Sequence, residues 1–244
     1  MKNLTYLKFE VLRTLRNRRF LIFALIFPLV LFFAIAGPNK NVIVEGIHFP
    51  LYYMTAMASW GAMTAMLSSG ARIAAERQIG WTRQMKITPL STRSYFSAKV
   101  LCGYMMAFFT IIALGIAGSI LGVHLSALDW LKLVALLVVG LIPFAVIGIL
   151  LGHLMKVDSL GPALGGVTSL FALLGGSFGP IFQSGFMLKV VQDIPSYWLV
   201  KSSQSVLSPS GWPPLQMWIV IAIWTLAMSR LAVRVYRRDS SRVT

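Results

Sequence analysis

The sequence predicts an all-α integral membrane protein with six transmembrane helices, and three observations support this fold class. Hydrophobic residues make up 57% of the chain and charged residues only 12%, whereas about a quarter of a soluble domain is charged. Six apolar stretches approach or exceed the roughly 17–25 helical residues that cross a bilayer core. Lys and Arg gather in alternate connections between these stretches. Because lipid offers the backbone no hydrogen-bond partners, each stretch must be helical.

The chain begins with a basic segment, residues 1–19, whose aliphatic residues recur at helical spacing. This pattern predicts an amphipathic helix in the inner membrane interface, either a lipid anchor or a lever that touches a partner subunit. A basic segment of this length also favours a retained first helix over a cleaved signal peptide. We treat residues 1–244 as one transmembrane domain, because no connection is long enough to fold around its own core. The transmembrane helices are predicted at residues 20–36, 49–71, 100–123, 133–152, 160–182 and 215–233, with kinks at Pro28 and Pro143.

The distribution of basic residues predicts the orientation. Of the 22 Lys and Arg residues, 18 lie in the N-terminal segment, the second and fourth connections and the C-terminal end, and 4 lie in the other connections. By the positive-inside rule, both termini are cytoplasmic, which agrees with an even number of helices. The formal charge of +15 is therefore interpreted as orientation and contact with anionic membrane lipids, not as nucleic-acid binding.

The residues that would support chemistry on this chain are missing from the sequence. No phosphate-binding loop occurs, Cys102 is the single cysteine, and the three histidines fall in separate loops. We therefore expect no catalytic residues, no metal site and no cofactor on this chain. None of the seven acidic residues lies within a predicted transmembrane helix, which counts against an ion-coupled secondary transporter. That transporter and a membrane-embedded lipid-modifying enzyme remain the alternative functions.

The connection after the second predicted helix carries the most specific pattern. It reads Glu-Arg, a spacer with Gly80, a basic stretch, and then Thr-Pro-Leu-Ser at residues 88–91. Here the chain resembles the permease subunits of the ABC type-2 exporter family, and the weaker likeness extends over the whole chain. The sequence departs from the family pattern at Gln78 and Trp81. The residues that match in register are Glu76, Arg77, Gly80, Met85, Thr88, Pro89, Leu90 and Ser91.

The resemblance implies a bacterial cytoplasmic-membrane permease that pairs with an identical or a sister permease. It also implies two cytoplasmic ABC ATPase subunits that bind ATP and Mg²⁺, so this chain is not itself an enzyme. The cargo would be a hydrophobic or amphipathic drug, antibiotic or lipid, as in multidrug transport and antibiotic resistance. In the family, the matched loop forms a coupling helix seated on the ATPase. The implied coupling residues are Glu76, Arg77, Gly80, Trp81, Met85, Thr88, Pro89, Leu90 and Ser91.

Elementary chemistry suits these residue types to a coupling loop. Gly80 permits a turn, Ser91 can cap the next helix, and Trp81 and Met85 can fill a pocket on a partner. The alternative interpretation is a basic loop that only orients the protein. In the family, the second and fifth helices line the substrate route, and methionines mixed with hydroxyl residues suit an adaptable apolar surface. The predicted path is Met57, Trp60, Met63, Thr64, Thr168 and Phe171, with ordinary helix packing as the alternative.

Two further patterns give expectations about packing and gating. Glycines four residues apart, such as Gly148 and Gly152, predict close helix–helix approach, mostly within one subunit. The apolar outer connection around residues 186–208 predicts short helices that dip back towards the bilayer. We expect this connection to act as an outer gate, and a surface lid is the alternative.

Overall fold

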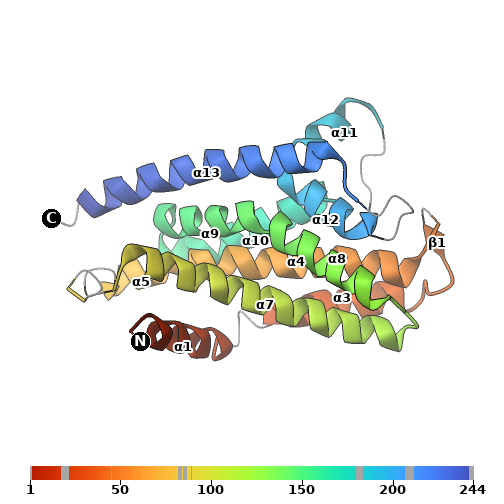
Figure 1. Ribbon diagram of the computed structural model, residues 1–244, viewed down its shortest axis with the longest axis horizontal. Helices are drawn as coiled ribbons and strands as arrows, with labels where there is room; N and C mark the ends of the chain where they lie inside the picture. The colour runs from red at the N-terminus through yellow and green to blue at the C-terminus, as the bar shows by residue number, and fades with distance from the viewer. Residues whose placement is uncertain are drawn as a thin grey trace.

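The computed structural model is an elongated helical bundle (Figure 1). It describes residues 2–17, 22–44, 46–81, 84, 87–88, 90–179, 184–206 and 212–241. Both chain ends, α1 and α5 lie at one end of the long axis, and the hairpin β1–β2 and helix α11 lie towards the other (Figure 1). The first elements are α1 (Lys2–Leu15), η1 (Ile22–Ile26), α3 (Phe27–Ala36), β1 (Ile43–Val44), β2 (Ile47–His48), α4 (Phe49–Ala71) and α5 (Ile73–Gln78).

The remaining elements complete the bundle around α4. They are α7 (Thr92–Ile120), α8 (Ala127–Gly140), α9 (Ile142–Leu154), α10 (Val157–Leu174), α11 (Gly185–Gln192), α12 (Pro195–Ser205) and α13 (Leu215–Ser241). The β1–β2 hairpin, which has two residues in each strand, was not expected from the sequence. All the other regular elements of the described chain are helical, as predicted.

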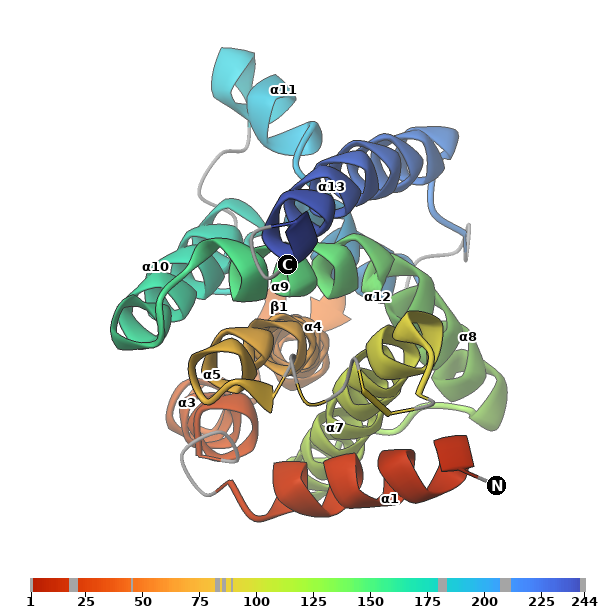
Figure 2. The same cartoon turned by 90° about the vertical axis from the view of Figure 1, so that its left-hand side faces the viewer.

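Helix α4 is the centre of the core. Its residues are buried on nearly every side, because α3, α7, α9, α10 and α12 all pack against it (Figure 2). Four other segments are long and apolar enough to cross a membrane: Thr92–Ile120, Ala127–Leu154, Val157–Leu174 and Leu215–Arg238. Helix α4 falls outside these four because its Ser, Thr and Trp residues lower its hydropathy. A helix enclosed by other helices does not need a lipid-facing surface.

Several predicted helix bounds are corrected. The second predicted helix has the bounds of α4, but the third begins at Thr92 instead of residue 100, because Ser91 caps it by accepting a hydrogen bond from Ser94 N. The fourth begins at Ala127 and is interrupted at Leu141. The last continues beyond residue 233 to Ser241.

The first and fifth predicted helices also differ from the structure. The fifth ends at Leu174 instead of residue 182, because Gly176 and Gly179 have positive φ angles of 76° and 122°. Residues 180–182, like residues 18–21 before η1, lie outside the described residues. Pro28 follows the π-helical turn η1, and Pro143 follows the break at Leu141, so both predicted kinks coincide with helix irregularities.

Glycines let α4 and α9 approach at backbone distance. A Cβ on Gly148 would lie 2.6 Å from the Leu67 carbonyl oxygen, and one on Gly152 would lie 2.6 Å from the Gly70 carbonyl oxygen. This confirms the close approach predicted for that pair. By contrast, Gly161 and Gly165 of α10 face open space.

Candidate functional site

A buried cluster of charged side chains joins α1, α5 and α7 at the end of the bundle that holds both termini. Lys99 of α7 is only 1% exposed, Glu10 of α1 4%, and Glu76 of α5 0%. The Lys99 Nζ lies 2.6 Å from Glu10 Oε1 and also donates a hydrogen bond to Glu76 Oε1. Because Lys99 is held between two carboxylates from different helices, it fastens α1 and α5 to the base of α7. We call Glu10, Arg13, Arg72, Glu76, Tyr95 and Lys99 the ion network.

The outer members of the ion network supply further hydrogen-bond donors and positive charge to its two carboxylates. Arg13 donates to Glu76 Oε1 at 2.7 Å, and Tyr95 Oη donates to Glu76 Oε2 at 2.5 Å. Arg72 Nη2 lies 3.6 Å from Glu10 Oε1. Each buried carboxylate thus faces more than one donor, as buried charges require.

The orientation of α1 follows from this network. Its polar residues Glu10 and Thr14 are buried, whereas Phe9 and Leu12 are 65% and 46% exposed. Helix α1 lies across the end of the bundle (Figures 1 and 2). Its outward side carries Phe9 and Leu12 together with exposed cations such as Lys8, whereas Glu10 and Thr14 face the protein. Helix α1 is thus fixed to the bundle through its buried polar residues.

Tyr6 on α1 lies beside the same network. Its ring centroid is 6.2 Å from that of Tyr95. Burial raises the pKa of Tyr6, and the nearby carboxylates of Glu10 and Glu76 raise it further. Tyr6 is therefore uncharged and lies along one side of the ion network.

Two of the predicted coupling residues are used inside the molecule. The side chain of Glu76 is part of the ion network. Arg77 donates to the backbone oxygens of Gly152 and His153 at 3.3 and 2.5 Å, where the C-terminal carbonyls of α9 have no helical partner. These two side chains hold the loop in place. The geometry therefore favours an internal role for each of them over contact with a partner.

The rest of the predicted loop makes a turn and a short exposed segment. Gly80 has a φ of +72°, a left-handed conformation that glycine adopts at no steric cost, so α5 ends there. Trp81 is half-buried, and its indole Nε1 has no hydrogen-bond partner in the described part of the chain. Thr88 is exposed and Leu90 is half-buried. Met85 and Pro89 lie outside the described residues.

The structure also identifies two loop residues that the sequence motif missed. Ile79 is 66% exposed and Ile87 is 88% exposed, and both lie at the end of the bundle beyond the apolar helices. Both side chains are thus available for a contact with another protein. The sequence feature that could have identified them is their position, since Ile79 directly precedes Gly80 and Ile87 directly precedes Thr88.

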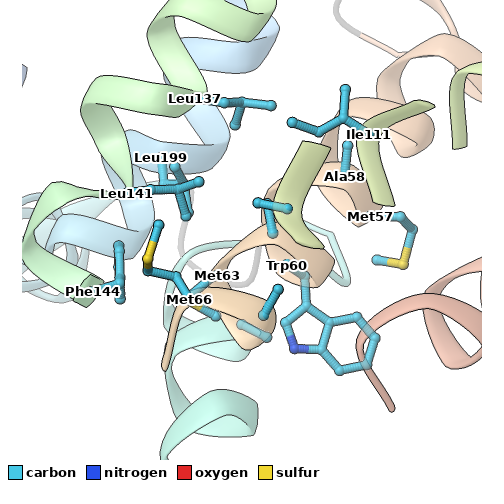
Figure 3. Close-up of a cluster of buried hydrophobic side chains, with 14 of the residues drawn as sticks. Met57, Ala58, Trp60, Met63, Met66, Ile111, Leu137, Leu141, Phe144 and Leu199 are labelled. Carbon is cyan, nitrogen blue, oxygen red and sulfur yellow. The ribbon is translucent and has the colours of Figure 1, made fainter. Parts of the chain in front are cut away.

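The predicted substrate-path residues separate into two groups. Met57 and Met63 are fully buried within the hydrophobic core. Figure 3 shows Met63 near Phe144 and Leu141, and Met57 on the far side of the same cluster. In this structure both methionines therefore act as packing residues.

The other four path residues lie on α4 and α10, which contact each other. Trp60 is 6% exposed and lies edge-on to Phe178, with ring centroids 5.0 Å apart. The polar atoms Trp60 Nε1 and Thr64 Oγ1 have no hydrogen-bond partner among the described residues. Thr168 donates to its own helix at Leu164 O, and Phe171 meets Phe144 edge-on at 5.4 Å.

The outer connection forms the short helices α11 and α12, as predicted. Trp224 of α13 donates to the Asp193 carbonyl oxygen at 2.7 Å. Trp224 is nine residues into α13, so at about 1.5 Å per residue the junction between α11 and α12 lies about 13 Å below the start of α13. The connection thus folds back alongside the bundle. Whether it gates a path stays a prediction. Among the described residues, no group of three or more His, Cys, Asp or Glu side chains could hold a metal ion.

The structure therefore defines a helical protein with membrane-crossing segments and a charged junction at one end. No family model matches the chain. Among curated proteins, it is similar to the "Putative transport permease YvfS" of Bacillus subtilis (strain 168), with 24% identity over 237 residues that cover 96% of each chain. This match confirms the resemblance to permeases that the sequence indicates.

Proposed function

We propose that the chain is the membrane-spanning permease subunit of an ATP-driven exporter. It crosses the membrane six times with both termini in the cytoplasm, and a separate ABC ATPase subunit supplies the energy. The observation that carries the proposal is the exposed loop, with Ile79 and Ile87 at its surface, mounted on the ion network at the end that holds both termini. The full-length likeness to a relative named as a transport permease supports the same function.

The ion network gives the loop a mechanical base. Breaking a buried ion pair costs about 3–5 kcal/mol. The α1 helix, α5 and the base of α7 therefore move as one unit in any motion that supplies less free energy than this. When the ATPase pushes on the loop, α5 carries this motion into α7 through Glu76 and Lys99. It also carries the motion into α4, which α5 follows directly in sequence. Motion of α4 against its neighbours would then open the route outwards.

The proposed cargo is hydrophobic or amphipathic, and its route runs where α4 meets α10. The walls around Trp60 and Phe171 are apolar. The polar atoms of Trp60 and Thr64 have no hydrogen-bond partner among the described residues. Both features suit a largely apolar molecule with a hydrogen-bond acceptor. We further propose that the permease pairs with an identical or a sister permease, because the exposed face of α10 is lined by glycines that permit close approach.

Co-purification with the ATPase tests this proposal. In a tagged permease isolated from its own host, we expect an ATPase subunit to co-elute and to hydrolyse ATP. Ile79→Ser and Ile87→Ser should release that subunit, whereas Ile43→Ser, at a position 62% exposed in β1 at the opposite end, should retain it. Absence of any ATP-hydrolysing partner from the intact wild-type complex would overturn the proposal.

The buried carboxylates of the ion network are also a feature expected of the alternative function, an ion-coupled secondary transporter. Buried ionisable groups are the usual means by which ion-coupled transporters bind their driving ion, and Glu10 and Glu76 are buried. A cluster in which three cations, Arg13, Arg72 and Lys99, already face the two carboxylates is poorly suited to that task. Substrate movement driven by a proton or sodium gradient in ATP-free vesicles would favour the rival over the exporter.

A further inference from the structure

Helix α13 presents a continuous stripe to the outside of the bundle. Its membrane-crossing part is only 11% buried, and Ile219, Ile223 and Leu226 are 49%, 59% and 60% exposed. These three residues follow the spacing of one helix face. Four residues beyond Leu226, the same stripe continues with Arg230 and then Arg234, which are both exposed. The surface thus changes from apolar to cationic along one line.

The two arginines lie towards the C-terminal end of α13. Arg230 and Arg234 follow the start of α13 at Leu215 by 15 and 19 residues, which correspond to about 22 and 28 Å along a helix. Trp212, before that start, is 66% exposed, as expected of an aromatic residue at the outer interface. Since the hydrocarbon core is about 30 Å thick, both guanidinium groups can reach the opposite boundary, where phosphates lie.

Neither arginine has a carboxylate partner among the described side chains. In the part of the chain that the structure describes, the ion pairs between helices use Arg13, Arg72 and Lys99, and no carboxylate pairs with Arg230 or Arg234. A guanidinium binds phosphate through two parallel hydrogen bonds. Residues four apart on a helix have Cβ atoms about 5–6 Å apart, so both side chains can converge on one phosphate group.

From this arrangement we infer that Arg230 and Arg234 form a binding site for the phosphate of an anionic phospholipid on the lipid-facing side of α13. The adjoining stripe of Ile219, Ile223 and Leu226 supports the acyl chain of the same lipid. The net positive charge selects a headgroup that carries no compensating cation, so phosphatidylglycerol is favoured over phosphatidylcholine. A protein occupant is less suited, because the arginines continue an apolar stripe that bilayer lipid covers. The inference rests on α13 crossing the membrane and not on ATP-driven export.

Native mass spectrometry of the detergent-purified full chain tests the site, with phosphatidylglycerol and phosphatidylcholine added in equal amounts. The wild type should retain phosphatidylglycerol preferentially, and R230Q/R234Q should weaken that binding on the order of 30-fold. The double variant R16Q/R93Q is the matched control, because it removes two exposed cations from outside this stripe. It should leave the tightest phosphatidylglycerol site intact.

Three results would overturn the inference. Equal loss in the two double variants would indicate diffuse attraction of anionic lipid to a basic surface. Unchanged lipid binding in R230Q/R234Q would exclude the site. Unchanged lipid binding together with loss of a co-purifying protein subunit would assign the arginines to a protein partner. Because lipid is counted directly, the outcome is independent of whether the chain works with an ATPase.

Discussion

Lys99 gives the sharpest test of the ion network. It contacts Glu10 at 2.6 Å, donates to Glu76, and lies 5.3 Å from the ring centroid of Tyr95, while its own side chain is 1% exposed. Lys99→Met keeps most of the side-chain volume and removes the charge. Two carboxylates are then left with only their peripheral arginines, and removal of one partner from a buried ion pair costs about 3–5 kcal/mol.

The size of the effect can be converted into a melting temperature. For a protein of this size, 1 kcal/mol corresponds to about 2–4 °C in Tm, so Lys99→Met should lower the Tm in detergent by on the order of 10 °C. The control is Lys8→Met, which removes the same charge from an exposed position on α1 and should change the Tm by about 2 °C or less. Equal shifts in the two variants would refute the view that the network holds this junction together.

Three other substitutions test separate parts of the structure. Gly148→Leu should prevent the close packing of α4 and α9 at Leu67, and we expect loss of the monodisperse protein peak in size-exclusion chromatography; an unchanged peak would contradict that packing. Gly80→Val should cost about 1–2 kcal/mol locally and speed proteolysis of the loop without lowering the yield of folded protein; unchanged cleavage would contradict the turn. Met63→Ala should destabilise the core by about 2–5 kcal/mol but leave substrate-stimulated ATPase activity unchanged in the surviving protein, because Met63 is a packing residue; loss of that stimulation would place Met63 on the path.

The sequence predicted a helix well where an uncharged run has clear ends, and less well where polar residues extend the helix. The second predicted helix matches α4 at both ends. The third was expected to begin after Lys99, because a charge normally ends an apolar run. In the structure α7 begins at its cap residue Ser91, and Lys99 lies inside the helix because two carboxylates neutralise it.

The ion network could not be predicted from the sequence. Lys99 is 89 residues from Glu10 and 23 residues from Glu76, and no local pattern links three charges at such separations. The loop motif correctly singled out Glu76 as unusual but suggested a role at a partner surface. The structure gives its side chain an internal role and leaves the exposed positions to Ile79 and Ile87. A motif can therefore identify the segment that matters without showing which of its side chains face outwards.

Cross-linking from Ile87 tests the central claim most directly. A cysteine placed at this 88% exposed position, in the complex isolated from native membranes, should form a covalent adduct with an ATP-binding subunit when a short bifunctional reagent is added. A cysteine at Ser184, next to α11 and away from the loop (Figure 1), should form none. The adduct from position 87 alone is the predicted result, and a complex that hydrolyses ATP yet never cross-links at position 87 would contradict the role given to this loop.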